Sequence, residues 1–140
     1  MMAIPDVRRQ MHTTGYAITR TLDAPFDVTV ARVTETLADE GFGVLSTIDV
    51  QATMKRKLDL DVPSYVILGA CNPALASAGL AAEPDLGVLL PCNVVVRREG
   101  GDTIVSAMEP TAAIRLAANP DLEPLAAEAR TRIERAIANL

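Results

Sequence analysis

The residues Ser64-Tyr65-Val66-Ile67-Leu68-Gly69-Ala70-Cys71 form a nearly continuous apolar run in the middle of the chain. An apolar run without alternation predicts a central strand that is covered on both faces or lies at an interface. Asn72-Pro73 interrupts the run, and the Ala-rich segment that follows predicts a small helix over residues 73–83. The apolar run is therefore expected to be the strand around which the sheet is built.

Two more strands are predicted after this helix. Pro84-Asp85-Leu86-Gly87 has the composition of a turn. Residues 88–98 then predict a strand that Pro91 interrupts, because a proline has no N–H to donate to a sheet ladder. Glu99-Gly100-Gly101-Asp102 is a strong hairpin signal, and residues 103–108 predict the returning strand.

The chain before the central run predicts a strand, a helix, a second strand and a short helix. Residues 15–22 have strand character, and Pro25 suits the start of a helix that Gly41 ends. Residues 42–48 predict a short strand, after which Asp49 caps a helix that runs to about Leu58. The stripe that marks the first helix recurs at helical spacing and consists of Phe26, Val30, Val33 and Leu37.

The last helix has the clearest pattern in the chain. One stripe of its surface is apolar and consists of Leu122, Leu125, Ala129, Ile133, Ala136, Ile137 and Leu140. Most of its Arg and Glu residues lie off that stripe, as in a helix that packs on a core with one face. No period of about 20–50 residues repeats along the chain. We therefore expect a single α+β domain over residues 15–140.

Length, composition and charge exclude several classes of protein. The 140 residues fit one domain, and a hydrophobic content of 49% is enough for a core. The balance of 18 Asp and Glu against 13 Lys and Arg gives a net charge of −5. Nucleic-acid binding relies on clustered Lys and Arg, so we expect no nucleic-acid partner. The basic run Lys55-Arg56-Lys57 is either a solvated helix face or an anion site.

The first residues and the cysteines bear on where the protein works. No stretch of about 18 apolar residues is present, so no membrane association is expected. Residues 1–14 lack the apolar core of a secretory signal, which favours a cytoplasmic protein. They are also polar and without periodicity, so we expect a flexible N-terminal tail. Two cysteines are too few for a disulfide framework.

Two motifs carry a resemblance to a known family. They are the segment Tyr65-Val66-Ile67-Leu68-Gly69-Ala70-Cys71-Asn72-Pro73 and the segment Leu89-Leu90-Pro91-Cys92-Asn93-Val94-Val95-Val96. With Glu40-Gly41-Phe42 and the helix start at Asp49-Val50, they resemble the domain-of-unknown-function family numbered 302, from about residue 15 to residue 140.

The resemblance implies an α+β fold similar to that of the TATA-binding protein. The sheet is mostly antiparallel, in the order strand, helix, four strands, helix, with extra short helices between strands. Family members are homodimers, so the resemblance implies a homodimer here. It implies no activity, since none is established for the family, and nucleic-acid binding does not follow from the fold.

Cys71 and Cys92 are the first candidates for chemistry. A thiol becomes a nucleophile or a ligand when a cation, a metal or a helix N-terminus lowers its pKa. Cys71 precedes the predicted helix at Pro73, whereas Cys92 has no comparable neighbour in sequence. The alternative is that both are small buried apolar residues. A metal site would need Cys71 and Cys92 from two subunits, because one chain offers only these two cysteines and His12, expected to be a free surface residue.

Four further residues are predicted to surround the same site. Pro91 indicates an edge strand or a bulge beside Cys92, and a bulge would free backbone groups for a ligand. Asn72 and Asn93 are either hydrogen-bonding groups of that site or turn residues. Glu109, which with Met108 is expected to border the cavity of Cys92, is either an acid, base or ligand, or a solvated or capping carboxylate.

The sequence favours a binding protein over an enzyme. Its one His and four aromatic residues leave few familiar catalytic constellations. The first hypothesis is a homodimeric binding or sensing module for a small ligand, cofactor or metal, held by Cys71, Asn72, Cys92, Asn93 and Glu109. The alternative is a thiol-dependent redox protein or enzyme with Cys71 as nucleophile and Cys92 as resolving thiol. The expected dimer interface is the apolar run 66–70 or the strand around Pro91.

Overall fold

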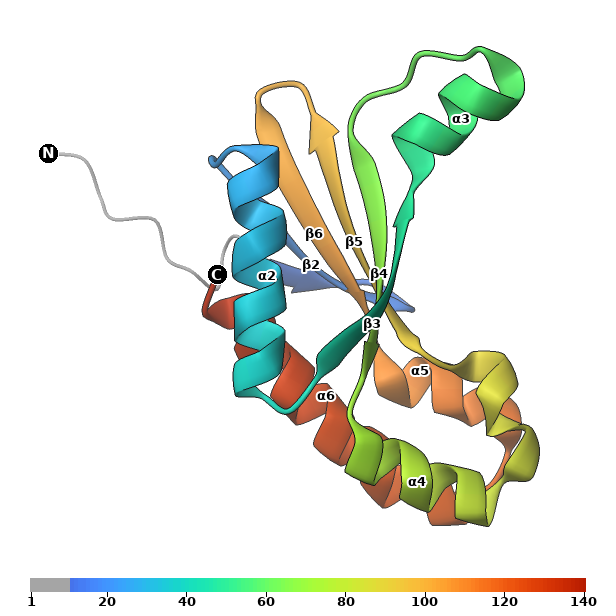
Figure 1. Cartoon of the computed structure of the whole chain (residues 1–140). Coiled ribbons are helices and arrows are strands. Elements are labelled where there is room, and N and C mark those ends of the chain that lie inside the picture. Colours follow the sequence, from blue (N-terminus) through green and yellow to red (C-terminus); the bar gives the residue numbers. More distant parts are fainter. Residues whose placement is uncertain (1–10) are drawn as a thin grey trace, which may run out of the picture.

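The computed structural model describes residues 11–140, in which six strands form one antiparallel sheet (Figure 1). The strand order is β1-β2-β6-β5-β4-β3. The strands are β1 (Met11–Thr13), β2 (Ala17–Leu22), β3 (Gly43–Asp49), β4 (Tyr65–Cys71), β5 (Cys92–Glu99) and β6 (Asp102–Met108). The α+β class and the order strand, helix, four strands, helix are confirmed between β2 and the last helix, with β1 as an additional strand.

The helices other than α3 lie on one face or at one end of the sheet. They are α2 (Phe26–Asp39), α3 (Val50–Leu58), α4 (Pro73–Ala82), α5 (Pro110–Ile114) and α6 (Glu123–Ala138), with short 3-10 segments at Pro84–Leu89, Arg115–Ala117 and Pro120–Leu122. Figure 1 shows α4, α5 and part of α6 beyond one end of the sheet, while α3 projects from the opposite end. None of the helices in residues 11–140 is long and apolar enough to cross a membrane.

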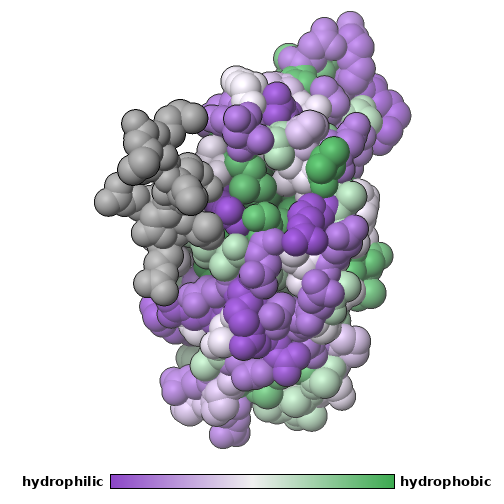
Figure 2. Space-filling model, turned by 90° about the vertical axis from the view of Figure 1, so that its left-hand side faces the viewer, coloured by the Kyte–Doolittle hydropathy of each residue, from purple (hydrophilic) through white to green (hydrophobic). Residues whose placement is uncertain are grey.

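The core lies between the sheet and the paired helices α2 and α6. The apolar stripes predicted for these helices face it, and Val33, Leu37, Ile133 and Ile137 are fully buried. The opposing sheet surface comes from alternate residues of the strands, such as Val94 and Val96 of β5. Seen from the α2 side, the outer surface is largely hydrophilic with small apolar areas between (Figure 2). The periodicity of both helices therefore predicted their buried faces.

Part of the predicted N-terminal tail is a strand. Met11 lies opposite Arg20, and Thr13 lies opposite Ile18, so β1 extends the sheet beyond β2. The rest of the predicted tail, residues 1–10, lies outside the described residues. Three residues are too few to show a periodicity, although Met11 packs partly buried against the core. The strand is also held by its backbone pairing with β2.

The strand predicted to contain Pro91 begins after it. Residues 84–89 form a 3-10 segment, the Leu90–Pro91 peptide bond is cis, and β5 starts at Cys92. Pro91 therefore lies outside β5 and interrupts no hydrogen bonds between strands. An edge strand and a bulge were the two alternatives for Pro91. The register of β4 with β5 is continuous from Tyr65 opposite Arg97 to Ala70 opposite Cys92, so this pair has no bulge beside Cys92. β5 lies between β4 and β6, so it is not an edge strand either. The sheet does have a register shift in β3, between Val44 and Ser46.

Candidate functional site

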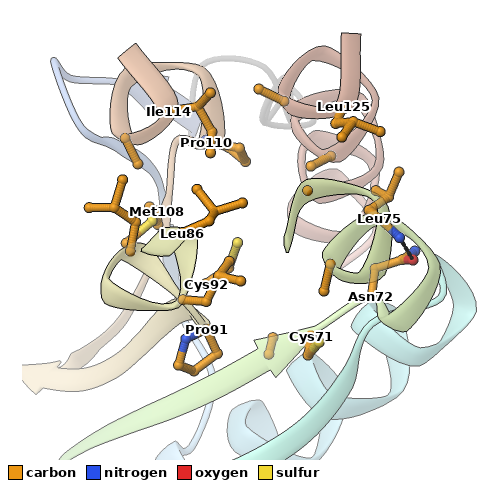
Figure 3. A pocket seen from close by; sticks show the side chains of 18 of the residues that line it. Cys71, Asn72, Leu75, Leu86, Pro91, Cys92, Met108, Pro110, Ile114 and Leu125 are labelled. Carbon is orange, nitrogen blue, oxygen red and sulfur yellow. Dashed lines mark hydrogen bonds between the residues drawn. The ribbon is translucent and has the colours of Figure 1, made fainter. Parts of the chain in front are cut away.

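An apolar hollow lies where α4, α5 and α6 meet the ends of β4, β5 and β6. The centre of a water-sized molecule can occupy about 70 Å³ of it, within about 620 Å³ of free space that includes the part open to solvent. Figure 3 shows its walls, with α4 and α6 on one side and α5 on the other. We call it the α4–α6 hollow. Its larger side chains are Phe42, Leu75, Leu86, Leu89, Leu90, Pro91, Met108, Pro110, Ile114, Leu122 and Leu125.

Three of the five predicted ligand-binding residues, Cys71, Asn72 and Cys92, line this hollow. Asn72 is buried and caps α4, because its Oδ1 accepts a hydrogen bond of 3.1 Å from the Leu75 backbone N–H. The bond is drawn in Figure 3. The Asn72 side chain thus fixes the start of α4, and its oxygen is already used within the protein.

Asn72 also lies against the turn that ends α2. Gly41 has φ +81°, a left-handed conformation that favours glycine, and a Cβ on it would stand 3.0 Å from Asn72 Nδ2. The α2–β3 turn and the cap of α4 are therefore packed together. This contact explains why Glu40-Gly41-Phe42 and Asn72-Pro73, distant in sequence, belong to one structural unit.

Cys92 is a protonated thiol in apolar surroundings. Burial raises its pKa to about 11, with a further contribution from Cys71. Its side chain points into the hollow, and Cys71 lies on the neighbouring strand (Figure 3). At neutral pH Cys92 therefore acts as a small apolar lining residue.

The two cysteines are not paired. Both are free thiols. In the register of β4 and β5, Cys92 lies opposite Ala70 and shares its face of the sheet. Cys71 is the next residue along β4, and successive side chains of a strand point to opposite faces. Both thiols border the hollow because it wraps around the strand ends.

The described part of one chain contains no ready metal site. Among residues 11–140, no three or more His, Cys, Asp and Glu side chains are grouped so that they could hold a metal ion. His12 is exposed on β1 and contributes to a different surface. The four-thiolate site predicted between two subunits requires a second chain and stays a prediction.

Asn93 and Glu109 line a different hollow on the face of the sheet that α2 and α6 leave open. We call it the sheet-face hollow. Asn93 is exposed there, since it follows Cys92 in β5 and points the opposite way. Met108 and Leu89 border both hollows. The structure thus divides the five predicted residues between two surfaces.

Glu109 is the N-cap of α5. Its carboxylate accepts hydrogen bonds from the backbone N–H groups of Thr111 (3.2 Å) and Ala112 (2.9 Å), and from the Thr111 hydroxyl. Arg130 Nε stands 3.5 Å away. Burial alone raises the pKa of Glu109, but these hydrogen bonds and the Arg130 charge outweigh it, so the pKa lies below its usual value. Of the alternatives considered for Glu109, the capping carboxylate is the one that the structure shows.

Most residues of the α4–α6 hollow were not predicted as site residues. Leu75, Leu86, Ile114 and Leu125 look like ordinary core positions in the sequence. The close packing of α4 is evident at Gly79, because a Cβ on this residue would stand 2.7 Å from Leu86 Cδ2. Met108 was expected to border the cavity of Cys92, and it does.

The fold and site define a small α+β domain with an apolar hollow at one end of an antiparallel sheet. The model of the family described as "Domain of unknown function DUF302" matches residues 18–140, and the chain belongs to this family. A solved structure titled as an uncharacterized conserved DUF302 protein from Bacillus stearothermophilus is similar, with 31% sequence identity and a TM-score of 0.82. The match covers 88% of this chain and 96% of that chain. No curated protein matches.

Proposed function

We propose that this protein is a binding module for a small, largely apolar ligand that occupies the α4–α6 hollow. The observation that carries the proposal is the chemistry of the lining. Among the described residues that line the hollow, Asn72 is the one whose side chain carries nitrogen or oxygen. Its oxygen already caps α4. The remaining lining offers apolar contact and little hydrogen bonding.

Such a lining selects against charged ligands. An ion or a strongly polar molecule would lose its hydration in the hollow without gaining partners. An apolar molecule would instead release poorly held water and gain dispersion contacts with the Leu, Ile and Met side chains. Small-molecule sites commonly combine a mostly apolar wall with a few polar groups. We therefore favour an apolar ligand over a metal or an anionic cofactor.

The thiol-dependent alternative receives no comparable support. A resolving thiol reacts as the thiolate, and the raised pKa of Cys92 keeps it protonated at neutral pH. The side chains of Cys71 and Cys92 also point to opposite faces of the sheet. Mild peroxide treatment followed by mass analysis separates the two functions. A Cys71–Cys92 disulfide formed within one chain would restore the redox function as a candidate.

The binding function is tested with N-phenyl-1-naphthylamine, a neutral apolar fluorophore. We expect saturable fluorescence enhancement with the wild-type protein. Ala76 of α4 lines the hollow, whereas Ala78 of the same helix is exposed. Ala76→Phe should fill the hollow and weaken binding at least about tenfold, equal to about 1.4 kcal/mol. Ala78→Phe is the matched control and should bind like the wild type.

Two results would contradict this proposal. One is the absence of saturable binding by the wild-type protein. The other is equal binding by Ala76→Phe and Ala78→Phe, which would place the fluorophore elsewhere. Thermal unfolding of both variants checks that each is folded before binding is compared. A ligand that binds the native state also raises Tm, so the wild-type Tm should increase with fluorophore concentration.

A further inference from the structure

The sheet-face hollow adjoins the α4–α6 hollow. Leu89, Met108 and Ala113 line both, and they come from the 3-10 segment before β5, from β6 and from α5. A side chain that lines two hollows is part of the barrier between them. This barrier includes a methionine, whose unbranched side chain adapts readily to its neighbours. A ligand longer than the α4–α6 hollow can therefore leave it across Met108.

The α4–α6 hollow by itself has room for a short apolar group. The centre of a water-sized molecule can occupy about 70 Å³ there. That volume is about five times what a single water needs. The corresponding volume in the sheet-face hollow is about 670 Å³. The longer part of an extended ligand therefore lies on the open face of the sheet, in contact with water.

The floor of the sheet-face hollow leads from Met108 to a charged side chain. Asn93, Val95 and Arg97 of β5 all line this hollow, because alternate residues of a strand point to the same face. Asn93 is level with Met108 in the register of β5 with β6. Arg97 lies four residues further along β5, which is about 13 Å in a strand. The half-buried apolar side chain of Val95 lies between them.

Arg97 is available to an anion at this end of the hollow. Its guanidinium stands 3.5 Å from the carboxylate of Glu99, and the two side chains are 33% and 68% exposed. An ion pair this exposed contributes little to stability, so a ligand carboxylate can replace Glu99. Tyr65 lies opposite Arg97 in β4 and lines the same hollow. The phenol ring therefore flanks the position of a bound anion.

The other charges of the sheet-face hollow do not oppose an anion there. Among the described residues that line it, Glu109 is the one carboxylate. Its oxygens accept hydrogen bonds from the N–H groups of Thr111 and Ala112, and Arg130 stands 3.5 Å away. His12 is exposed on β1. The hollow thus offers a cation and no free carboxylate, on a chain whose net charge is −5. Such a local field attracts an anion.

We infer that the ligand is a long-chain carboxylic acid, with the end of its hydrocarbon chain in the α4–α6 hollow and its carboxylate on Arg97. The inference rests on the proposed binding function and gives the chemical class of the ligand. The chain crosses Met108 and follows Val95 over the open face of the sheet. The carboxylate stays in contact with water, so no charge enters the apolar α4–α6 hollow.

The single guanidinium favours a carboxylate over a phosphate as the head group. Arginine binds either group in a bidentate manner. A carboxylate carries one negative charge, which Arg97 neutralises. A phosphate monoester carries nearly two, and the second would add to the negative charge of an acidic chain. The ligand class is therefore a monoanion with one hydrocarbon chain.

Isothermal titration calorimetry with tetradecanoate tests this inference directly. We expect saturable binding by the wild-type protein. Butanoate is too short to occupy the α4–α6 hollow and reach Arg97, and it should bind at least about tenfold more weakly. 1-Tetradecanol has the same chain without the charge, and it should also bind more weakly than tetradecanoate, by about tenfold or more.

Three variants test the role of Arg97. Arg97→Gln should weaken tetradecanoate binding about tenfold and leave the binding of N-phenyl-1-naphthylamine unchanged. Arg56→Gln removes the same charge from an exposed position on α3, outside both hollows, and should bind like the wild type. Glu99→Gln removes the carboxylate that competes for Arg97, so it should bind tetradecanoate more tightly than the wild type. A misfolded variant would not show this gain.

The inference and the proposed function fail on different results. Saturable fluorophore binding that Ala76→Phe weakens, without any tetradecanoate binding, would retain the apolar site and overturn the inference. Equal tetradecanoate affinity of the wild type and Arg97→Gln would overturn it as well, and so would equal affinity of the wild type for tetradecanoate and butanoate. Tetradecanoate binding that Ala76→Phe leaves unchanged would also overturn it, because the hydrocarbon chain would then lie outside the α4–α6 hollow.

Discussion

Arg20 is a buried cation that closes the end of α6. Its Nη1 donates hydrogen bonds to the backbone oxygens of Ile137 (3.1 Å), Ala138 (3.0 Å) and Leu140 (2.7 Å). These carbonyls lie at the negative end of the helix dipole, where a positive charge is stabilising. Burial lowers the pKa of Arg20, but a guanidinium stays charged in proteins. One side chain of β2 thereby holds the C-terminal end of the domain.

We predict that Arg20→Met lowers the free energy of unfolding by about 1.5–3 kcal/mol, the usual value for hydrogen bonds to a charged group. Arg32→Met is the control, because Arg32 donates to the Asn139 oxygen (3.1 Å) from an exposed position. Its loss should change stability by no more than about 0.5 kcal/mol. Urea unfolding of both variants measures the difference. If both variants lost the same free energy of unfolding, burial would not be what makes Arg20 stabilising.

Glu109 should make stability depend on pH in the acid range. Because its pKa is lower in the folded protein than in the unfolded chain, its contribution is present above the unfolded pKa. The contribution is lost as pH falls through the folded pKa. Glu109→Gln should destabilise the protein at pH 7 by about 0.5–2 kcal/mol, the usual range for a helix cap. Urea unfolding at pH 7 and below pH 4 should show this difference shrinking, and a constant difference would contradict the prediction.

At the scale of elements, Gly69 lets β3, β4 and the start of β5 come together. A Cβ on Gly69 would overlap Ser46 Oγ of β3 and stand 2.8 Å from Pro91 Cγ. Gly69→Ala must displace the Pro91 ring and the Ser46 side chain, and we expect a loss of about 1–3 kcal/mol in unfolding free energy. Gly43→Ala in β3 meets no atom within 4 Å and is the control. Thermal unfolding of the two variants compares them, and equal Tm values would refute the role of Gly69.

The sequence predicted a helix or strand correctly where the residues that determine it are close together in the chain. Asp49 caps α3 as expected, and the stripe of α6 is buried. The start of β5 was predicted too early, because the apolar residues before Pro91 serve the hollow rather than the sheet. Strand alternation already implied that Cys92 and Asn93 point to opposite faces. The α4–α6 hollow itself could not be predicted, since it depends on how three helices separated in sequence meet.

At the scale of the whole molecule, the ligand site and the β3 edge are separate surfaces of one domain. Leu45 and Ile48 do not line the α4–α6 hollow, and Ala76 lies on α4 rather than on the edge strand. We therefore predict that Leu45→Lys/Ile48→Lys binds N-phenyl-1-naphthylamine with the wild-type Kd. Ala76→Phe should bind the fluorophore weakly although the β3 edge is unchanged.

This pair of measurements also tests whether the two surfaces are coupled. Coupling between two sites is reciprocal in binding free energy, so an effect of the β3 edge on the hollow implies an equal effect of the ligand on the edge. If the lysine variant loses fluorophore binding while its Tm stays near that of the wild type, the hollow depends on the conformation of the β3 edge. Phe42 would be the first residue to examine, because it lines the hollow immediately before β3 begins at Gly43. Unchanged binding by the lysine variant instead shows that the hollow is a complete ligand site that does not depend on the β3 edge.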